Sequence, residues 1–147
     1  MRIGFDLDGV LATQDVTVII LIRDKGEFAE DQYAGTLRPQ LYPSMFLGKN
    51  DTAVIITARM ARLNLVTKEW CKLHFPSYKL FHVKVPQWLT THPSDIKKWQ
   101  NEVSRRKARL INKLQVEVYF EDMPDTVEQL RKLCPNCKII QYGGRVR

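Results

Sequence analysis

The chain has 147 residues, a length typical of one domain with a single hydrophobic core. Its 44% hydrophobic and 27% charged residues are values of a globular protein, which argues against disorder, collagen-like repeats and a coiled coil. The formal net charge of +7 favours partners that carry phosphate, without separating nucleotides from nucleic acids. A solvated helix face and a basic chain end would explain much of the same charge.

The sequence gives no sign of a membrane segment. The longest apolar run, residues 16–22, is far too short to span a bilayer. The first residues begin a predicted strand and lack the layout of a signal peptide. We therefore expect a cytoplasmic protein that does not contact a membrane.

The first predicted strand covers residues 2–6 and leads into Asp6-Leu7-Asp8-Gly9. A short apolar run that ends in acidic residues and a glycine is typical of a buried parallel strand that delivers side chains to the edge of a sheet. In extended backbone Asp6 and Asp8 lie on one side, where a divalent cation or a bound phosphate would relieve their repulsion. A simple Asp-Gly turn has the same sequence, so only the later elements of the chain can distinguish a ligand site from a turn.

Residues 12–50 have the least regular pattern. The run 16–22 is rich in β-branched residues but is also compatible with a buried helix, and Pro39 and Pro43 predict an irregular loop. We expect a small, cap-like insertion beside the site, which acts either as a lid or as a simple covering segment.

Four further strands and three helices are predicted after this insertion. The strands are residues 52–57, 79–83, 116–120 and 138–142, and the helices are residues 60–74, 96–114 and 124–133. Short apolar strands separated mostly by helices predict a single α/β domain over residues 1–147, with a five-stranded parallel sheet between helices.

Polar residues suited to phosphate or a metal follow the first, second and fourth strands. These residues are Asp6, Asp8, Thr57, Arg59, Glu121 and Asp122. Ligands of open α/β sheets bind at the carboxyl ends of the strands, so we expect the six side chains to converge there.

Four short motifs, in this order, resemble those of the haloacid dehalogenase (HAD) superfamily of phosphohydrolases. Asp6-Leu7-Asp8-Gly9-Val10 resembles the first motif, Asp-x-Asp-Gly-x, and Ile55-Ile56-Thr57 resembles the second. Lys107 resembles the lysine of the third motif, and Glu121-Asp122-x-x-Asp125 resembles the acidic fourth motif, with Glu in place of the commoner Asp. The resemblance covers almost the whole chain and implies a Rossmann-like HAD fold with at most a small cap insertion.

The resemblance also implies a reaction, the hydrolysis of a phosphomonoester through an aspartyl phosphate. Asp6 would be the nucleophile, and Asp8 would be the general acid and then the general base. The cofactor Mg²⁺ would be held by Asp6, the backbone carbonyl of Asp8, and Asp122, with Glu121 or Asp125 assisting through water.

The phosphate group itself would contact Thr57, Ala58, Arg59 and Lys107. Thr57 would donate a hydrogen bond, Lys107 would offset the charge of phosphate and nucleophile, and Arg59 would grip the phosphate bidentately. A capping threonine and solvated basic side chains are the alternatives without function. The other candidates for the third-motif lysine are Lys97, Lys98 and Lys113.

Two segments narrow the expected substrate. Thr57-Ala58-Arg59 and residues 121–127 are similar to the phosphatase domain of phage-type polynucleotide kinases and to 5′(3′)-deoxyribonucleotidases. This similarity implies a nucleotide or a nucleic-acid 3′-terminal phosphate as substrate. The alternatives are a phosphatase of another small phosphorylated metabolite and a non-catalytic nucleic-acid-binding module. The sequence has no Gly-x-x-x-x-Gly-Lys-Ser/Thr run, so we expect no kinase activity in this chain.

Two short spacings, Cys71-x-x-His74 and Cys134-x-x-Cys137, match those of zinc ligand pairs. The predicted helices that carry them cover different parts of the sheet. We therefore expect buried thiols in preference to a zinc site or a disulfide bond.

Overall fold

The computed structural model describes residues 1–13, 34, 37–84 and 96–143. Most of the predicted insertion, residues 14–33 and 35–36, lies outside the described residues, and so do residues 85–95 and 144–147. The expectation that residues 12–50 form a cap-like insertion therefore stays a prediction.

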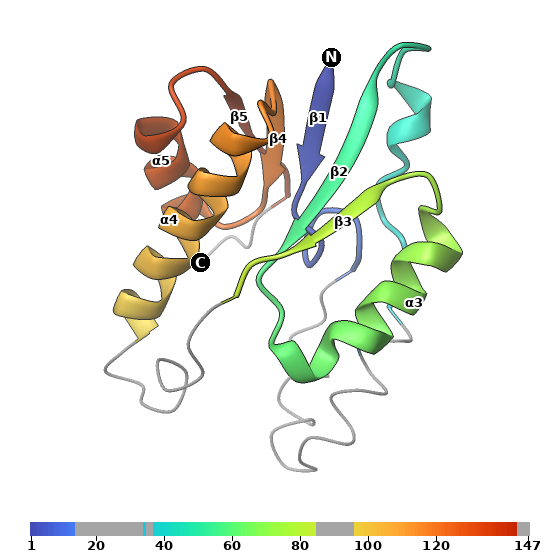
Figure 1. The fold of residues 1–147 in the computed structure, drawn as a ribbon, viewed down its shortest axis with the longest axis horizontal. Helices are drawn as coiled ribbons and strands as arrows, with labels where there is room; N and C mark the ends of the chain where they lie inside the picture. The colour runs from blue at the N-terminus through green and yellow to red at the C-terminus, as the bar shows by residue number, and fades with distance from the viewer. Residues whose placement is uncertain (14–33, 35–36, 85–95, 144–147) are drawn as a thin grey trace.

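One sheet of five parallel strands, in the order β3-β2-β1-β4-β5, forms the centre of the structure (Figure 1). The strands are β1 (Arg2–Phe5), β2 (Thr52–Thr57), β3 (Lys79–His82), β4 (Val118–Glu121) and β5 (Lys138–Gln141). The predicted α/β fold with a five-stranded parallel sheet is confirmed. The chain builds outward from β1 through β2 to β3 and then returns to the other side of β1, so the strand order reverses there. Such a switch point is where open α/β sheets bind ligands.

The start of β4 differs from the sequence prediction, which placed it at residue 116. Gln115 has a positive φ of 54°, and the backbone N–H of Val116 donates to the carbonyl of Ile111. These residues therefore close the preceding helix, and the strand begins only at Val118. The shift brings Glu121 into the strand as its last residue.

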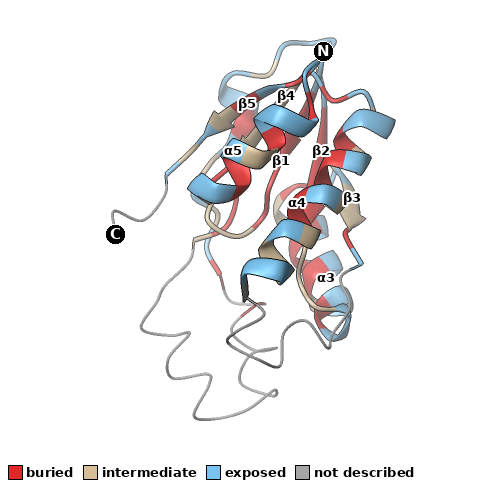
Figure 2. Cartoon of the chain, turned by 90° about the vertical axis from the view of Figure 1, so that its left-hand side faces the viewer, coloured by how far each residue is buried: buried red, intermediate tan, exposed pale blue. Residues whose placement is uncertain are grey.

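Three α-helices of the described residues cover the sheet (Figure 1). They are α3 (Asn64–His74), which follows the short 3-10 helix η2 (Ala61–Leu63), α4 (Ile96–Lys113) and α5 (Pro124–Leu133). Figure 2 shows that the buried residues of the helices face the sheet while exposed residues face outward. None of the helices in the described ranges combines the length and the apolar content that crossing a bilayer requires.

Alternate side chains of β2 point into two separate cores, as the two-residue period of a strand requires. Ile55 packs with Phe5 and the α3 residue Trp70, whereas Val54 and Ile56 belong to the core under α4 and α5. Gly4 has a packing reason of its own, because a Cβ there would lie 2.7 Å from the Cδ2 atom of Tyr119. The ring of this fully buried tyrosine therefore covers the central strand closely.

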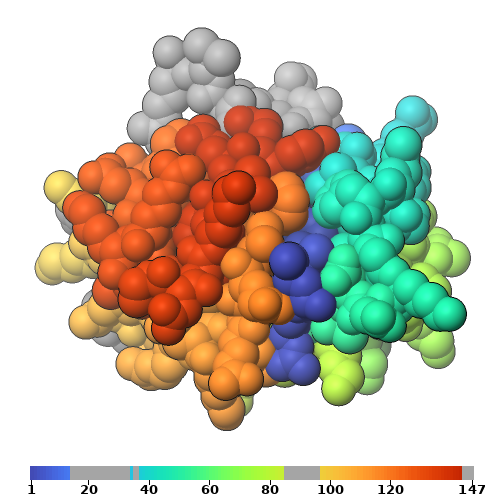
Figure 3. All heavy atoms as spheres, turned by 90° about the horizontal axis from the view of Figure 1, so that it is seen from above, coloured from blue at the N-terminus to red at the C-terminus, as the bar shows by residue number. Residues whose placement is uncertain are grey.

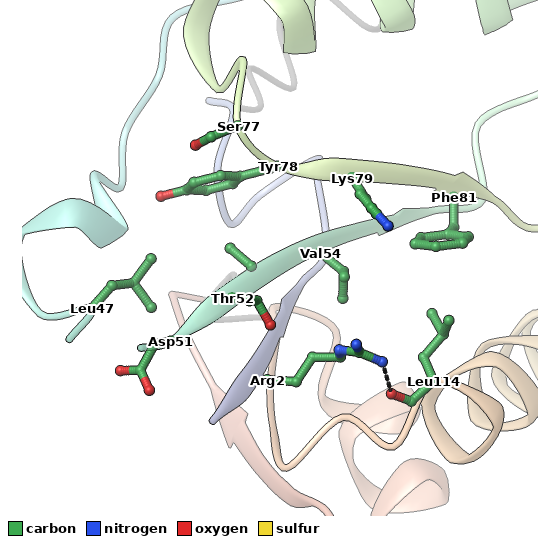
Figure 4. A pocket seen from close by; sticks show the side chains of 11 residues that line it. Arg2, Leu47, Asp51, Thr52, Val54, Ser77, Tyr78, Lys79, Phe81 and Leu114 are labelled. Atoms are coloured by element: carbon green, nitrogen blue, oxygen red, sulfur yellow. Dashed lines mark hydrogen bonds between the residues drawn. The ribbon is translucent and has the colours of Figure 1, made fainter. Parts of the chain in front are cut away.

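A hollow of about 330 Å³ lies at the amino ends of the strands, the edge of the sheet opposite the carboxyl ends (Figure 4). Its lining includes the first residues of three strands, Arg2, Thr52 and Lys79, and the guanidinium of Arg2 donates to the carbonyl of Leu114. Seen from above, the N-terminal residues reach the surface between the segments that lead into β2 and β4 (Figure 3). This hollow lies at the other end of β1 from Asp6 and is not part of the candidate site.

Candidate active site

Three acidic side chains meet at the carboxyl ends of the two central strands. Asp6 directly follows β1, Glu121 ends β4, and Asp122 comes next. The backbone N–H of Asp6 donates to the carbonyl of Phe120 at 2.9 Å, which fixes the register of the two strand ends. All three carboxylates are buried, and their oxygen atoms include a set within 4.8 Å of one another.

The turn after Asp8 brings the backbone of Gly9 close to the carboxylate of Asp122. Gly9 has a φ of +83°, a left-handed conformation that favours glycine. A Cβ at this position would lie 2.1 Å from the Oδ2 atom of Asp122. Gly9 therefore lets the backbone turn sharply and lets the carboxylate of Asp122 approach it.

Lys107 brings a positive charge from α4 into the carboxylate group. Its Nζ atom lies 3.1 Å from Oδ1 of Asp6 and 2.7 Å from Oε2 of Glu121. The lysine is only 4% exposed, and burial alone would lower its pKa, but Asp6 and Glu121 outweigh burial and raise the pKa well above its ordinary value. Of the four lysines considered for the third motif, Lys107 is thus placed beside the predicted nucleophile.

The charges in this group are not balanced. Burial, followed by the charge of Glu121, raises the pKa of Asp6 well above its ordinary range and the pKa of Asp122 to about 7. Burial would also raise the pKa of Glu121, but the ammonium of Lys107 lowers it below its ordinary value. Among the described residues one cation, Lys107, therefore contacts this group of three carboxylates, and a further cation would relieve their repulsion.

The donor chemistry of the group fits a hard divalent cation. The three residues that could hold a metal offer carboxylate oxygens only, which is the ligand type that Mg²⁺ prefers. Asp125 is exposed in the first turn of α5, outside these three residues. Glu121 has the ammonium of Lys107 as a close partner, a contact that the sequence did not reveal.

Asp8 points to a different partner. Its two carboxylate oxygens accept hydrogen bonds from Nε and Nη2 of Arg59, at 2.9 and 2.6 Å. The remaining nitrogen, Nη1, donates to Oγ1 of Thr67 at 3.1 Å. Arg59 was predicted to grip phosphate bidentately, but in this structure its bidentate contact is with Asp8. Thr67 was not predicted as a site residue, because no local feature distinguishes a threonine inside a helix.

The end of β2 lies next to this pair. Thr57 is 1% exposed, and its hydroxyl accepts a hydrogen bond from the backbone N–H of Arg59 at 3.3 Å. Ala58, half-buried, lies between them in the sequence. His82 pairs with Thr57 in the sheet register, and its Nδ1 atom is buried with no hydrogen-bond partner among the described residues. Burial, followed by the charge of Arg59, lowers the pKa of His82.

The cysteines lie apart from the acidic group. Cys71, Cys134 and Cys137 are free and buried, as the sequence predicted. Burial raises the pKa of the Cys71 and Cys134 thiols to about 11, so both stay protonated at neutral pH. The carbonyl of Ala108 accepts a weak hydrogen bond from Cys134, which gives this thiol a structural contact.

The strand order and the parallel pairing define a Rossmann-like α/β fold with acidic residues at its switch point. No protein-family model matches the sequence, and no curated protein matches it. Two solved structures are similar in fold. A chain in the structure of the Pnkp1/Rnl/Hen1 RNA repair complex has a TM-score of 0.64 and 13% identity over 97% of this chain. The HAD domain of the effector protein Lem4 from Legionella pneumophila has a TM-score of 0.50 and 10% identity over 98% of this chain.

The extent of these two matches differs. The chain spans about 42% of the length of the RNA repair chain and about 85% of the Lem4 domain. At such low identities the likeness shows the fold and not the activity. The HAD-type fold predicted from the four motifs is confirmed.

Proposed function

We propose that this chain is a Mg²⁺-dependent phosphomonoester hydrolase that acts through an aspartyl phosphate on Asp6. The observation that carries the proposal is the placement of Asp6, at the carboxyl end of the central strand and 3.1 Å from the ammonium of Lys107. A carboxylate that attacks a phosphate ester needs positive charge close to both groups, because they repel each other.

The residues at this edge fit the metal that the proposal requires. Asp6, Asp122 and the backbone carbonyl of Asp8 would hold Mg²⁺, with Glu121 or Asp125 assisting through water. Bound Mg²⁺ would reduce the repulsion between the nucleophile and the phosphate. The unbalanced charge of the buried carboxylates supports this assignment, since they gain from a further cation.

In the proposed reaction Asp6 forms the bond to phosphorus and Asp8 transfers the protons. A carboxylate oxygen of Asp6 forms a bond to phosphorus while the bond between phosphorus and the ester oxygen breaks. Asp8 gives its proton to the departing oxygen and later takes one from the water that hydrolyses the aspartyl phosphate. Thr57, Ala58 and Lys107 contact the phosphate oxygens, while Arg59 has its principal partner in Asp8.

A nucleotide or a nucleic-acid 3′-terminal phosphate is the substrate that we favour. The net charge of +7 suits such a partner, and the Thr57-Ala58-Arg59 segment resembles nucleic-acid end phosphatases. A chain of similar fold belongs to an RNA repair complex, which agrees with this choice. We propose a cytoplasmic location, without contact to a membrane.

The test compares phosphate release from 3′-phosphorylated oligonucleotides with release from mononucleotides, with Mg²⁺ and with a chelator. Release that requires Mg²⁺ and is lost in Asp6→Asn supports the proposal, and the ratio of the two rates selects the substrate. No release from either substrate contradicts it. Release only from other compounds in a panel of phosphate esters would identify a metabolite phosphatase.

A non-catalytic nucleic-acid-binding module is the second candidate, and the basic composition favours it. Such a module would bind oligonucleotides with an affinity that falls steeply with salt, and Asp6→Asn would leave that affinity unchanged or increase it. Binding without phosphate release would therefore select this candidate over the enzyme.

A further inference from the structure

Each nitrogen of the Arg59 guanidinium has a partner within the protein. Nε and Nη2 contact the two oxygens of Asp8, and Nη1 contacts the hydroxyl of Thr67. The Arg59 side chain is only 5% exposed, whereas that of Asp8 is 31% exposed. The edge of the guanidinium that Nε and Nη2 form is therefore taken by Asp8, and a phosphate could reach only the remaining N–H groups.

Arg59 is held at both ends. Its backbone N–H donates to the hydroxyl of Thr57 at the end of β2, and the tip of its side chain contacts Thr67 in α3. Thr67 is completely buried, and α3 is fixed on the sheet by Trp70 and Cys71, which belong to the core. The position of the guanidinium is therefore set by a strand end and by a packed helix.

Asp8 depends on this arrangement for its orientation. It lies in the turn after β1, and among the residues that the structure describes Arg59 is the partner of its carboxylate. A partly exposed carboxylate without a partner can adopt several rotamers. Proton transfer requires a short, directed contact with the reacting oxygen, so a fixed rotamer accelerates it.

We propose that Arg59 and Thr67 form a positioning pair that holds the carboxylate of Asp8 in line for proton transfer. The inference rests on the proposed phosphatase function. It assigns to Arg59 a role in orienting Asp8 in place of the phosphate contact expected from the sequence. It also gives the completely buried Thr67 a role in the reaction, which acts through Arg59. The packing of α3 on the sheet thereby governs the proton-transfer step.

The test uses two esters that differ in their need for a proton. The leaving group of p-nitrophenyl phosphate is stable as an anion, whereas the sugar oxygen of a 3′-phosphorylated oligonucleotide must be protonated as it leaves. Thr67→Val removes the hydroxyl and keeps the shape of the side chain. Thr67→Ser keeps the hydroxyl and is the matched control.

In Thr67→Val, kcat for the oligonucleotide is expected to fall by about 10- to 100-fold while KM changes little, because a misaligned group slows the chemical step. The loss with p-nitrophenyl phosphate is expected to stay below about threefold, since that ester needs little help from a general acid. Thr67→Ser should restore the oligonucleotide rate. Arg59→Lys keeps the charge but not the three directed contacts, and should reproduce the selective loss.

Several results would overturn the inference. A rise in KM for both esters in Arg59→Lys would show that Arg59 grips the phosphate. Equal losses with both esters in Thr67→Val, together with a lower melting temperature, would show a purely structural role. A crystal structure of Thr67→Val in which Arg59 and Asp8 keep both contacts would refute the positioning role whatever the activity. Failure of the proposed function is distinct, since the parent protein would then hydrolyse neither ester.

Discussion

The two aspartates of the first motif, only two residues apart, lie in opposite electrostatic environments. Asp6 faces β4 and α4, where Glu121, Asp122 and Lys107 leave an excess of buried negative charge. Asp8 faces β2 and α3, where a bidentate contact with Arg59 balances its charge one to one. The unbalanced side is suited to taking up a cation, and the balanced side is suited to fixing an orientation. The comparison explains how one short motif can supply two different chemical roles.

The largest effect is expected on the unbalanced side from Asp6→Asn. This variant removes the atom that would attack phosphorus, so we expect phosphate release to fall by at least about 10⁴-fold. Single-turnover assays with labelled substrate would measure the loss. Asp51→Asn, at the amino edge of the sheet and far from the site, is the matched control and should lose far less activity. Comparable losses in the two variants would contradict the assignment of the nucleophile.

Lys107→Met should destabilise the protein more than Arg59→Met does. Without Lys107, the buried carboxylates lose their counter-charge, at a cost of about 3–5 kcal/mol in the free energy of unfolding. Without Arg59, the partly exposed Asp8 can still be hydrated, so the expected cost is about 1 kcal/mol. Urea denaturation in the presence of a chelator measures both values. Equal losses of unfolding free energy in the two variants would show that the environments of Asp6 and Asp8 do not differ in this way.

Gly9→Ala tests whether the turn beside Asp122 tolerates a side chain at position 9. A Cβ would lie 2.1 Å from Oδ2 of Asp122, and the left-handed conformation adds about 1–2 kcal/mol of strain for a residue with a side chain. We expect Mg²⁺ affinity to fall by about 10- to 100-fold as the carboxylate is displaced. Calorimetric titration with Mg²⁺ would measure the change. Gly48→Ala, in which a Cβ would lie 3.1 Å from Asp51, is the control far from the site and should leave the affinity unchanged.

The last expected effect is a pH dependence of stability in the metal-free protein. The pKa of Asp122 is about 7 in the folded state, against an ordinary value of 3.8. Between these values the folded state binds a proton that the unfolded chain does not, so the free energy of unfolding decreases as pH rises from about 4 to about 7.

Thermal melts of the parent and of Asp122→Asn would measure this contribution. With a chelator present, the melting temperature of the parent should decrease more over this pH range than that of the variant. Mg²⁺ should raise the melting temperature of the parent more at neutral than at acidic pH, because metal ligands must be deprotonated. Identical pH profiles of parent and variant would contradict the raised pKa.

Much of the fold could be predicted because the strands are short apolar runs whose ends carry the polar residues. Thr57 and Glu121-Asp122 were recognisable because each follows such a run directly. The late start of β4 could not be predicted, since it depends on the positive φ of Gln115. Which residues lie next to the end of a strand depends on the order of the strands in the sheet, and the local sequence does not specify that order.

The contacts that cross between elements were the hardest to foresee. Four lysines were candidates for the third motif, and only the placement of α4 distinguishes the one that lies against Asp6. The contact between Arg59 and Thr67 depends on how η2 and α3 turn the chain after β2, and two residues of such common types give no local signal. The assignment of Arg59 to phosphate, which came from the resemblance to the phosphatase domain of phage-type polynucleotide kinases, stays a prediction.

The central position of β1 also determines the order in which the site can be assembled during synthesis. β1 can pair with β2 once residue 57 has been made, but it pairs with β4 only after residue 121 has been made. Asp6 therefore has neither Lys107 nor Asp122 beside it until those residues have been made. Contacts over such long sequence separations form late because loop closure costs entropy. The proposed catalytic centre is thus completed only after β4 has been made, and a nascent chain that stops before β4 has strand β1 but no site.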